Sequence, residues 1–418
     1  MVELENRRTN LFKKMRDNSV AILFAGVPKK VSEDETYPFI VNRNFFYLTN
    51  IEQDNSILVL VKGIGEKKTY LFIDEFDELK EKWTGKRLTV DEARELSQIN
   101  NINFTSSFEN VISLILNKVQ GQFGKINTVY LDLTPELKIK DSYSTENYKD
   151  FLEAEYAPIE IENVYPLLRD LRMIKSPYEV EQLVNAINAT YSGISQMLLS
   201  LKPGILEYEL ADIFEFYGRK NGRRKLAFST IVASGKSATC LHYPTQTEPV
   251  RPNELILFDL GYQHEGYCAD ISRTFPVNGV FEGVQKEVYE AVLNTNKDVI
   301  NFVRAGMTIA DLQQHAKECL TKECIERGLL KDGEEISKIY FHNVSHHLGL
   351  DTHDISDRSR PLENGNVITV EPGLYIKELG IGVRIEDDVL ISDGRGVCLS
   401  KNIVKEIPDI ERLLKSKI

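Results

Sequence analysis

Short apolar runs and amphipathic segments alternate along the first part of the chain. Runs rich in β-branched and aromatic residues, which are typical of strands, occur at 20–24, 56–61, 69–73 and 128–133. Apolar residues in 90–99 recur at the spacing of a helix. Strands that alternate with helices are typical of an α/β domain, which we predict over residues 1–165.

A long helix is predicted to open the second part of the chain. Ser176 and Glu179 have the spacing of a capping box, and Pro177 stands at the first helical position. Apolar residues then recur at helical spacing through 180–201. We therefore place a second domain at residues 170–418.

Two segments of this second domain resemble each other, which indicates two related halves. Residues 202–210 begin with Lys-Pro-Gly-Ile and residues 304–312 with Arg-Ala-Gly-Met, and each segment joins two helical patterns. Farther along, the pattern favours two strand pairs, at 255–260 with 267–277 and at 366–376 with 381–391. The second domain is therefore predicted to be a duplicated α+β fold.

Composition excludes several classes of protein. A chain of 418 residues with 42% hydrophobic and 27% charged residues suits two globular domains, and no apolar run approaches the length of a membrane span. The charged N-terminal segment has no signal-peptide character, so a cytoplasmic location is expected. A net charge of −12 argues against nucleic acid as a partner. The five cysteines, without a CxxC pair, predict reduced and mostly buried thiols.

Acidic residues interrupt the apolar strands of the second domain. Asp259 closes one strand, and Asp270 lies in its predicted partner, so the two carboxylates are expected side by side across the ladder. Glu371 and Glu386 stand in the second strand pair, again among apolar residues. Each acid alone is most simply a turn or surface residue, but four together in apolar surroundings need a partner.

Histidines gather near these acids in the sequence. His342, His346, His347 and His353 fall within twelve residues, and His242 lies in an upstream His-Tyr-Pro turn. Four carboxylates and one imidazole suit two divalent ions about 3.5–4 Å apart, which activate water for attack on a carbonyl. The pattern thus predicts hydrolysis of an amide.

Other chemistry finds weaker support in the sequence. The Gly-Lys-Ser at 235–237 lacks the glycine that a phosphate-binding loop requires at position 230, which is Thr. Cys240 and His242 are too close in sequence for a typical nucleophile and base, and no GxSxG elbow occurs. His264 and His315 are expected on a loop and a helix, without a catalytic part.

Four stretches carry a family resemblance. The segments FDLGYQHEGYCADISRTFPV, HNVSHHLGLDTHD, VITVEPGLYI and GVRIEDDVLI resemble, in this order, the proline-specific pita-bread metallopeptidases, namely aminopeptidase P and prolidase. The resemblance is strong over residues 170–400. VNRNFFYLTNI is similar to the N-terminal domain of the same family. The resemblance implies an α/β N-terminal domain and an α+β pita-bread catalytic domain with a curved antiparallel sheet.

The resemblance also implies roles for individual residues. The metal ligands would be Asp259, Asp270, His346, Glu371 and Glu386. Glu371 would also act as general acid or base, and the family spacing selects His346 rather than its neighbour as the ligand. His242, His342 and His353 would line the cleft and orient the peptide, and Arg384 would steady the site through ion pairing.

The implied activity is removal of the residue that precedes a proline, with peptides as substrates. AGVPKKVSEDETYPFIVNRNFFYLTNI favours an aminopeptidase, while a dipeptide-specific prolidase stays open as the alternative. The resemblance favours manganese, with Co, Fe or Zn as alternatives, and a homodimer or larger assembly whose N-terminal domain narrows access to the cleft. A binding protein or a metal-free, creatinase-like enzyme of this fold is disfavoured because all five ligand residues are present.

Overall fold

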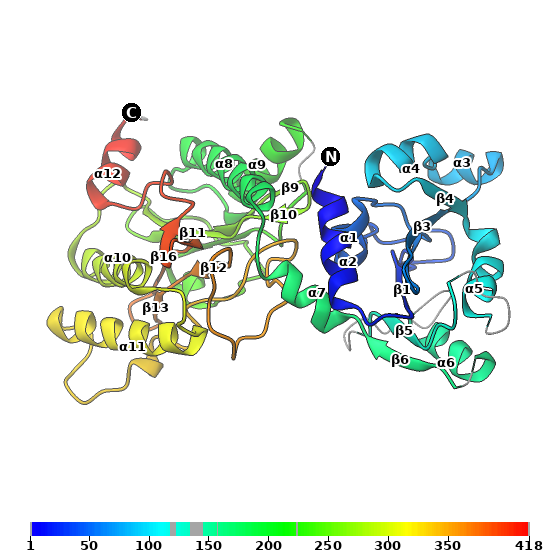
Figure 1. The fold of residues 1–418 in the computed structure, drawn as a ribbon. Coiled ribbons are helices and arrows are strands. Elements are labelled where there is room, and N and C mark those ends of the chain that lie inside the picture. The colour runs from blue at the N-terminus through cyan, green and yellow to red at the C-terminus, as the bar shows by residue number, and fades with distance from the viewer. Residues whose placement is uncertain (1, 118–122, 134–144, 157, 223–224, 417–418) are drawn as a thin grey trace. The chain divides into compact units, whose positions relative to one another are not determined.

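The computed structural model describes residues 2–117, 123–133, 145–156, 158–222 and 225–416. The chain forms two compact units, Met1–Leu171 and Arg172–Ile418 (Figure 1). None of the helices built from the described residues combines the length and the apolarity that crossing a membrane requires.

The first unit contains a six-stranded mixed sheet. Its strands are β1 (Ser19–Phe24), β2 (Ile57–Lys62), β3 (Lys67–Ile73), β4 (Asn101–Phe104), β5 (Thr128–Leu131) and β6 (Glu160–Asn163). They follow the order β4-β3-β2-β1-β5-β6, with β1, β2 and β3 antiparallel and the outer pairs parallel. The four predicted strands are confirmed. The two short edge strands were missed because they contain few apolar residues.

Helices surround this sheet. They are α1 (Val2–Lys14), α2 (Arg43–Thr49), α3 (Glu78–Thr84), α4 (Val90–Ser97), α5 (Phe108–Leu116), α6 (Thr145–Glu155) and α7 (Tyr165–Arg172), with a 3-10 turn η1 (Thr105–Ser107). Phe24, Phe72, Phe108 and Tyr148 form an aromatic cluster between one sheet face and α5 and α6. All six residues of β1 are buried, so both sheet faces are covered. This double burial explains why the strands read as continuous apolar runs.

The second unit is built on two pairs of helices. They are α8 (Pro177–Ser200), α9 (Glu207–Lys220), α10 (Gly283–Phe302) and α11 (Ile309–Glu326), followed near the C-terminus by α12 (Ile407–Lys415); the 3-10 turns are η2 (Gly235–Thr239) and η3 (Ile336–Lys338). The predicted capping box is confirmed, because Ser176 and Glu179 exchange side-chain and backbone hydrogen bonds at the start of α8. The four long helices flank the strands of this unit in Figure 1.

The two helix pairs share a connecting turn. α8 packs on α9 and α10 packs on α11. Gly204 and Gly306, at matching positions of the sequence repeat, have φ angles of +88° and +92°. Glycine adopts this left-handed conformation without steric cost, so both turns depend on it. The internal sequence similarity therefore corresponds to a repeated helix–turn–helix unit.

Antiparallel strands follow each helix pair. The strands are β7 (Ile231–Ser234), β8 (Leu255–Leu260), β9 (Gln263–His264), β10 (Tyr267–Cys268), β11 (Ile271–Pro276), β12 (Val367–Val370), β13 (Gly373–Ile376), β14 (Ile381–Arg384), β15 (Asp387–Ser392) and β16 (Arg395–Cys398). They form sheets in the orders β11-β8-β7, β12-β15-β16, β13-β14 and β10-β9. The strand sets of the two halves meet where β14 packs on β8 and β11. Both predicted strand pairs are present, but three of the four predicted segments, all except β8, are interrupted.

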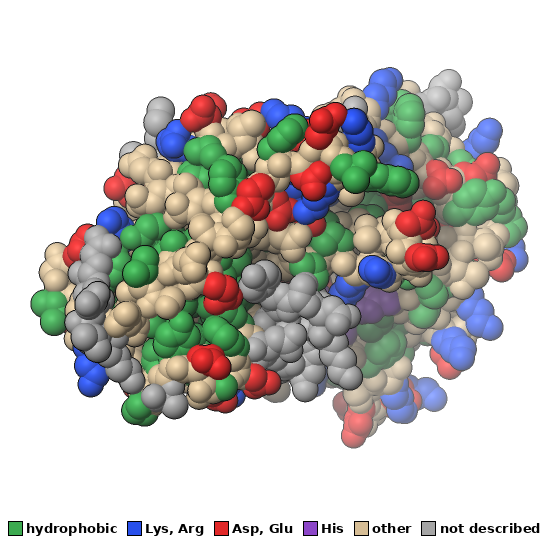
Figure 2. Space-filling view, turned by 90° about the vertical axis from the view of Figure 1, so that its right-hand side faces the viewer, with side chains coloured by type: hydrophobic (Ala, Val, Ile, Leu, Met, Phe, Trp, Pro, Cys, Tyr) green, Lys and Arg blue, Asp and Glu red, His purple; other side chains and the backbone are tan. Residues whose placement is uncertain are grey.

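Charged side chains of both signs are mixed on the surface. Lys and Arg are scattered among Asp and Glu on the face in Figure 2, whose described side chains form no continuous basic stripe. The described side chains on this face therefore form no basic patch that would offset the net charge of −12 and attract a phosphate backbone.

A buried ion cluster joins the start of the second unit to the segment after the histidine-rich stretch. Asp354 accepts hydrogen bonds from Arg172 at 2.5 Å and from Lys175 at 2.9 Å, and all three side chains are at most 2% exposed. Burial alone would raise the pKa of Asp354, but the charges of Arg172 and Lys175 outweigh it and hold the pKa at about 2. Asp354 thereby fixes the backbone next to His353.

We expect Asp354→Asn to lower the free energy of unfolding at pH 7 by about 3–5 kcal/mol, because two buried cations lose their partner. An unfolded Asp has a pKa of about 3.9. The stabilisation is therefore complete above about pH 4 and disappears as the pH falls toward 2, so wild type and variant should converge there. Denaturant unfolding followed by circular dichroism at several pH values measures this.

Asp351→Asn is the matched control, because Asp351 also pairs with Arg172 but its side chain is 38% exposed. The control should lose less than about 1 kcal/mol. Equal losses in the two variants, or a loss in Asp354→Asn that does not change with pH, would contradict this account of the cluster.

Candidate metal centre

Breaks in the strands position three of the four candidate carboxylates. Asp270 directly precedes β11, Glu371 lies between β12 and β13, and Glu386 lies between β14 and β15. Asp259 alone stands inside a strand, β8. At a break the backbone leaves the regular ladder, so a side chain can be aimed at a point that strict alternation would not allow. The interruptions of the predicted strands therefore coincide with the predicted site.

The register of β8 and β11 shows that the prediction of Asp259 and Asp270 side by side across the ladder was wrong. Asp259 faces Ser272 across the β8–β11 ladder, not Asp270, which lies two residues earlier on the same side. The Ser272 hydroxyl lies 3.2 Å from Asp259 Oδ1 and 2.7 Å from Glu386 Oε2 as a donor. Asp270 is thus a diagonal neighbour of Asp259, and the Ser272 hydroxyl lies between Asp259 and Glu386.

His346 reaches the acids from a segment beside β12. Its backbone carbonyl accepts a hydrogen bond from Thr369, and its Nδ1 lies 3.0 Å from the carbonyl of His347. Because a carbonyl can only accept, Nδ1 donates this hydrogen bond, and Nε2 is the nitrogen that faces the carboxylates. Nε2 lies 3.4 Å from Asp270 Oδ2 and 3.5 Å from Glu371 Oε1. The imidazole is therefore oriented as a ligand toward the carboxylates.

The side chain of the adjacent residue, His347, does not join the acids. His347 is buried, and its backbone forms a bridge with Ile368. Burial, reinforced by Lys175, lowers the pKa of His347 to about 3. The structure brings His346, and not His347, into the cluster with Asp270 and Glu386.

One buried arginine holds the opposite side of the site. Arg384 donates from Nη2 to Asp259 Oδ2 at 2.6 Å, and from Nε to the Ser272 hydroxyl at 2.7 Å. A third bond runs from Nη1 to the Tyr375 hydroxyl at 3.0 Å. A single guanidinium thus orients one carboxylate directly and a second, Glu386, through Ser272.

Burial and mutual repulsion raise the pKa of three carboxyl groups. The pKa of Asp270 lies well above its usual range because the group is buried and is close to the negative charge of Asp259. The pKa of Glu386 is raised in the same way by burial and by Asp270. Burial also raises the pKa of Glu371, although the neighbouring imidazole and guanidinium oppose the shift. A bound divalent cation reverses this repulsion and replaces the protons, so the site's charge fits a metal.

The positions of the donor atoms fit a metal as well. Asp270, His346 and Glu386 each offer a ligand atom within 4.8 Å of the other two, and all three residues are buried. Carboxylate oxygens with an imidazole nitrogen suit divalent ions such as Mn, Fe, Co and Zn.

A chain of polar groups extends from Arg384 to His342. The Tyr375 hydroxyl, which accepts from Arg384, lies 2.9 Å from His342 Nε2, and His342 Nδ1 lies 2.8 Å from the Asn343 carbonyl. Burial lowers the pKa of His342 to about 4, so the ring is neutral at pH 7. His342 Nδ1 is also 3.7 Å from Glu371 Oε2, which places this chain beside the carboxylates.

The two remaining predicted histidines are exposed. The His353 ring lies 4.4 Å from the His346 ring, edge to face, and burial of part of its surface lowers its pKa. His242 lies in a turn near enough to lower the pKa of both His342 and His353. His264, expected on a loop, lies in β9, and His315 lies on α11 as expected.

Sequence reasoning missed several residues that support the site. They are Ser272, Tyr375, Thr369, which donates to Glu371 Oε1, and Asn296. Asn296 on α10 donates to the carbonyls of Val370 and Ile385, at 3.1 and 3.2 Å. Nothing in the sequence spacing linked these residues to the acids.

Two family models match this chain. The metallopeptidase family M24 matches residues 181–393, and the N-terminal domain of aminopeptidase P matches residues 4–122. The chain is also similar to the Xaa-Pro aminopeptidase of Haemophilus influenzae, with 34% identity over 433 aligned residues that cover 99% of this chain and 97% of the relative.

Solved structures resemble the whole chain. A Bacillus anthracis protein proposed to be an aminopeptidase P has a TM-score of 0.94 and 40% identity, with 100% of this chain and 98% of that one covered. Aminopeptidase P of Escherichia coli with the inhibitor Pro-Leu has a TM-score of 0.90 and 30% identity at the same coverage. These similarities confirm the predicted fold class, an α/β N-terminal domain with an α+β pita-bread catalytic domain.

Proposed function

Since the chain belongs to metallopeptidase family M24, we propose that it removes the N-terminal residue from peptides whose second residue is proline. The observation that carries this proposal is the convergence of Asp270, His346 and Glu386 on one buried point. Similarity to Xaa-Pro aminopeptidases over nearly the whole chain supports the same reaction and makes the chain a metallo-exopeptidase.

We propose two divalent ions, held by Asp259, Asp270, His346, Glu371 and Glu386. Five donors from five chain segments, four of them carboxylates, are more than a single ion needs when water also binds it. The raised pKa of Asp270, Glu371 and Glu386 supports this count, because one cation would leave much of their negative charge uncompensated. When bound, such ions lower the pKa of water and polarise a carbonyl.

Glu371 is proposed to carry the proton. Its side chain is 16% exposed, more than that of Asp270 at 6%, so it can meet substrate. Burial raises its pKa toward the range in which a carboxyl group both accepts and gives up a proton. The nitrogen of an Xaa-Pro bond carries no hydrogen, so the departing amine must receive a proton from the site. Glu371 is the described carboxyl group best placed to supply it.

The three other histidines and Arg384 are proposed to serve the substrate and the ligands. His342, neutral and fixed by Tyr375 and the Asn343 carbonyl, and the exposed His353 and His242 are proposed to orient the peptide and stabilise developing charge. Arg384 orients Asp259 directly.

A dipeptide-specific prolidase is the alternative reaction. The match of residues 4–122 to the aminopeptidase P N-terminal domain and the names of the full-length relatives both favour the aminopeptidase. A non-catalytic binding protein is disfavoured because buried acids without a cation repel each other, so there is no physical reason to retain them.

Three further features belong to the proposal. Manganese is proposed as the resident ion because the donors are mostly hard oxygen atoms, although Co, Fe and Zn also bind to such a set.

A homodimer or larger assembly is supported by exposed apolar side chains at Phe76, Leu79 and Trp83, which are 67–79% exposed. A cytoplasmic location is supported by five cysteines that form no disulfide.

The reaction is tested with three substrates: a tripeptide with proline in second position, the same tripeptide with alanine there, and the dipeptide Xaa-Pro. We expect the enzyme, isolated with Mn2+, to cleave a tripeptide Xaa-Pro-Xaa at its first bond and to lose this activity after chelation. A matched tripeptide with alanine in second position is the control and should be cleaved far more slowly. Chromatography of the products measures both rates. Hydrolysis of the dipeptide Xaa-Pro alone would overturn the choice of aminopeptidase.

The proposed roles predict different defects for two substitutions. Glu371→Gln keeps the shape but removes a charge and a proton acceptor, so it should lose nearly all turnover and weaken one ion. His353→Ala removes no proposed ligand and should keep both ions while turnover falls by about 10² to 10⁴. Metal content and turnover are measured on the same preparations. Loss of metal from His353→Ala, together with full metal content and activity in Glu371→Gln, would show that the assignment is wrong.

A further inference from the structure

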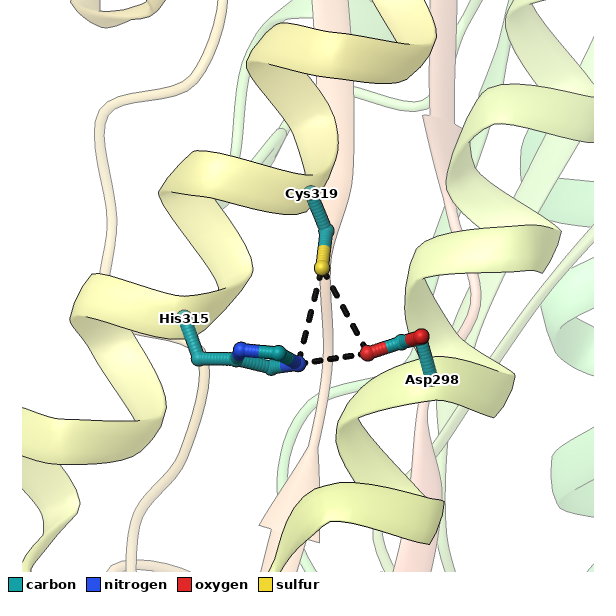
Figure 3. A group of neighbouring side chains, drawn as sticks. All are labelled: Asp298, His315 and Cys319. Carbon is teal, nitrogen blue, oxygen red and sulfur yellow. Dashed lines mark hydrogen bonds and ion pairs between the residues drawn. The ribbon is translucent and has the colours of Figure 1, made fainter.

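A second group of side chains of the types that ligate metals lies on the helices α10 and α11. Asp298 projects from α10, and His315 and Cys319 project from α11, one helical turn apart (Figure 3). The three ligand atoms lie within 4.8 Å of one another. None of these residues takes part in the proposed peptidase site.

The distances between these atoms approach those around a tetrahedral ion. Cys319 Sγ lies 3.4 Å from Asp298 Oδ1 and 3.5 Å from His315 Nε2. Bond lengths of about 2.3 Å to sulfur and 2.0 Å to nitrogen or oxygen give tetrahedral edges of roughly 3.5 Å for both pairs. The third edge, from Nε2 to Oδ1, is 2.5 Å, where a hydrogen bond holds the atoms. An ion there requires only this edge to open, by roughly 0.8 Å.

The arrangement does not suit a catalytic triad. In such a triad the carboxylate binds one imidazole nitrogen and the nucleophile faces the other. Here both Asp298 and Cys319 contact the same atom, His315 Nε2, as Figure 3 shows. Burial and the charge of Asp298 also raise the pKa of the Cys319 thiol to about 12, which is the opposite of an activated nucleophile. The three ligand atoms instead form one closed triangle, a face that a single ion could share.

We propose that Asp298, His315 and Cys319 form a second metal site, for a divalent ion of the zinc class. A set of one soft thiolate, one borderline imidazole and one hard carboxylate prefers Zn2+ or Co2+ over the Mn2+ that oxygen-rich sites accept. The side chain of Asp298 is 57% exposed and that of His315 is 23% exposed, so an ion has access and water can complete its shell.

The surroundings hold the ligands in place and favour a cation. The His315 ring stacks on Phe302, with centroids 3.7 Å apart and planes at 11°, which limits rotation of the imidazole. Besides Asp298, the carboxylates of Glu318 and Glu323 act on the thiol. Negative charge around a thiol opposes the bare thiolate but attracts the cation that would stabilise it.

The site would tie together two helices that support the peptidase centre from their inner faces. On α10, Asn296 bonds the carbonyls that precede Glu371 and Glu386. On α11, Gln313 bonds the backbone of His342 and Val344. An ion that binds the folded state and cross-links both helices stabilises it by mass action. The ion is therefore assigned a structural role, which does not rest on the proposed reaction.

Cobalt provides a test because a thiolate bound to Co2+ absorbs in the near ultraviolet by charge transfer, whereas the proposed peptidase ligands include no sulfur. Full-length protein loaded with Mn2+ is titrated with Co2+. We expect a charge-transfer band that saturates at one equivalent and disappears when Zn2+ is added. Cys319→Ser should abolish the band, and Asp298→Asn or His315→Ala should weaken Co2+ binding roughly tenfold or more.

Cys240→Ser is the matched control, because Cys240 is exposed and lies two residues from His242 but is not part of this cluster. It should leave the band unchanged. The hydroxyl of Cys319→Ser is nearly isosteric, and unchanged Mn2+-dependent peptidase activity would verify its fold. Absence of the band in the wild type, or its persistence in Cys319→Ser, would overturn the proposal.

Discussion

The crowding of buried carboxylates around one imidazole nitrogen is the constraint on which the rest of the catalytic unit depends. Burial and like-charged neighbours raise the pKa of Asp270, Glu371 and Glu386, and the guanidinium of Arg384 is paired with Asp259 rather than with any of these three. The acids therefore need a bound divalent metal to be held in their charged form. In this view the fold supplies the geometry and the metal supplies the charge balance.

The duplicated fold, with helices outside and interrupted strands inside, positions these acids close to one another. Breaks after β12 and β14 free Glu371 and Glu386 from strict alternation. Asn296 of α10 then bonds both backbones one residue earlier, where the ladder no longer supplies a partner. Ser272 links the strands of the two halves, since it contacts Asp259 of one and Glu386 of the other. Each half thus contributes some of the proposed ligands to one site.

The sequence predicted the features that depend on the local pattern of residues. Apolar runs located most strands, the capping box located α8, and acids in apolar surroundings pointed to a metal. Register and packing could not be predicted in this way: Ser272, not Asp270, faces Asp259. The expectation of mostly buried thiols was wrong, because only Cys268 and Cys324 are buried.

The group formed by Asp298, His315 and Cys319 illustrates the same limit of prediction from sequence. His315 and Cys319 are four residues apart and share a helix face, which sequence alone reveals. Asp298 joins them only because α10 packs on α11, and the residue is separated from His315 by 17 positions. Contacts between distant segments depend on how helices pack, and a single sequence does not specify that packing.

The most direct test of the account is anomalous diffraction from crystals grown with Mn2+, collected at the manganese absorption edge. The account predicts two neighbouring peaks enclosed by Asp259, Asp270, His346, Glu371 and Glu386, with His347 outside the coordination shell. No peak among these carboxylates, a single peak at saturating Mn2+, or a peak bound by His347 would contradict it.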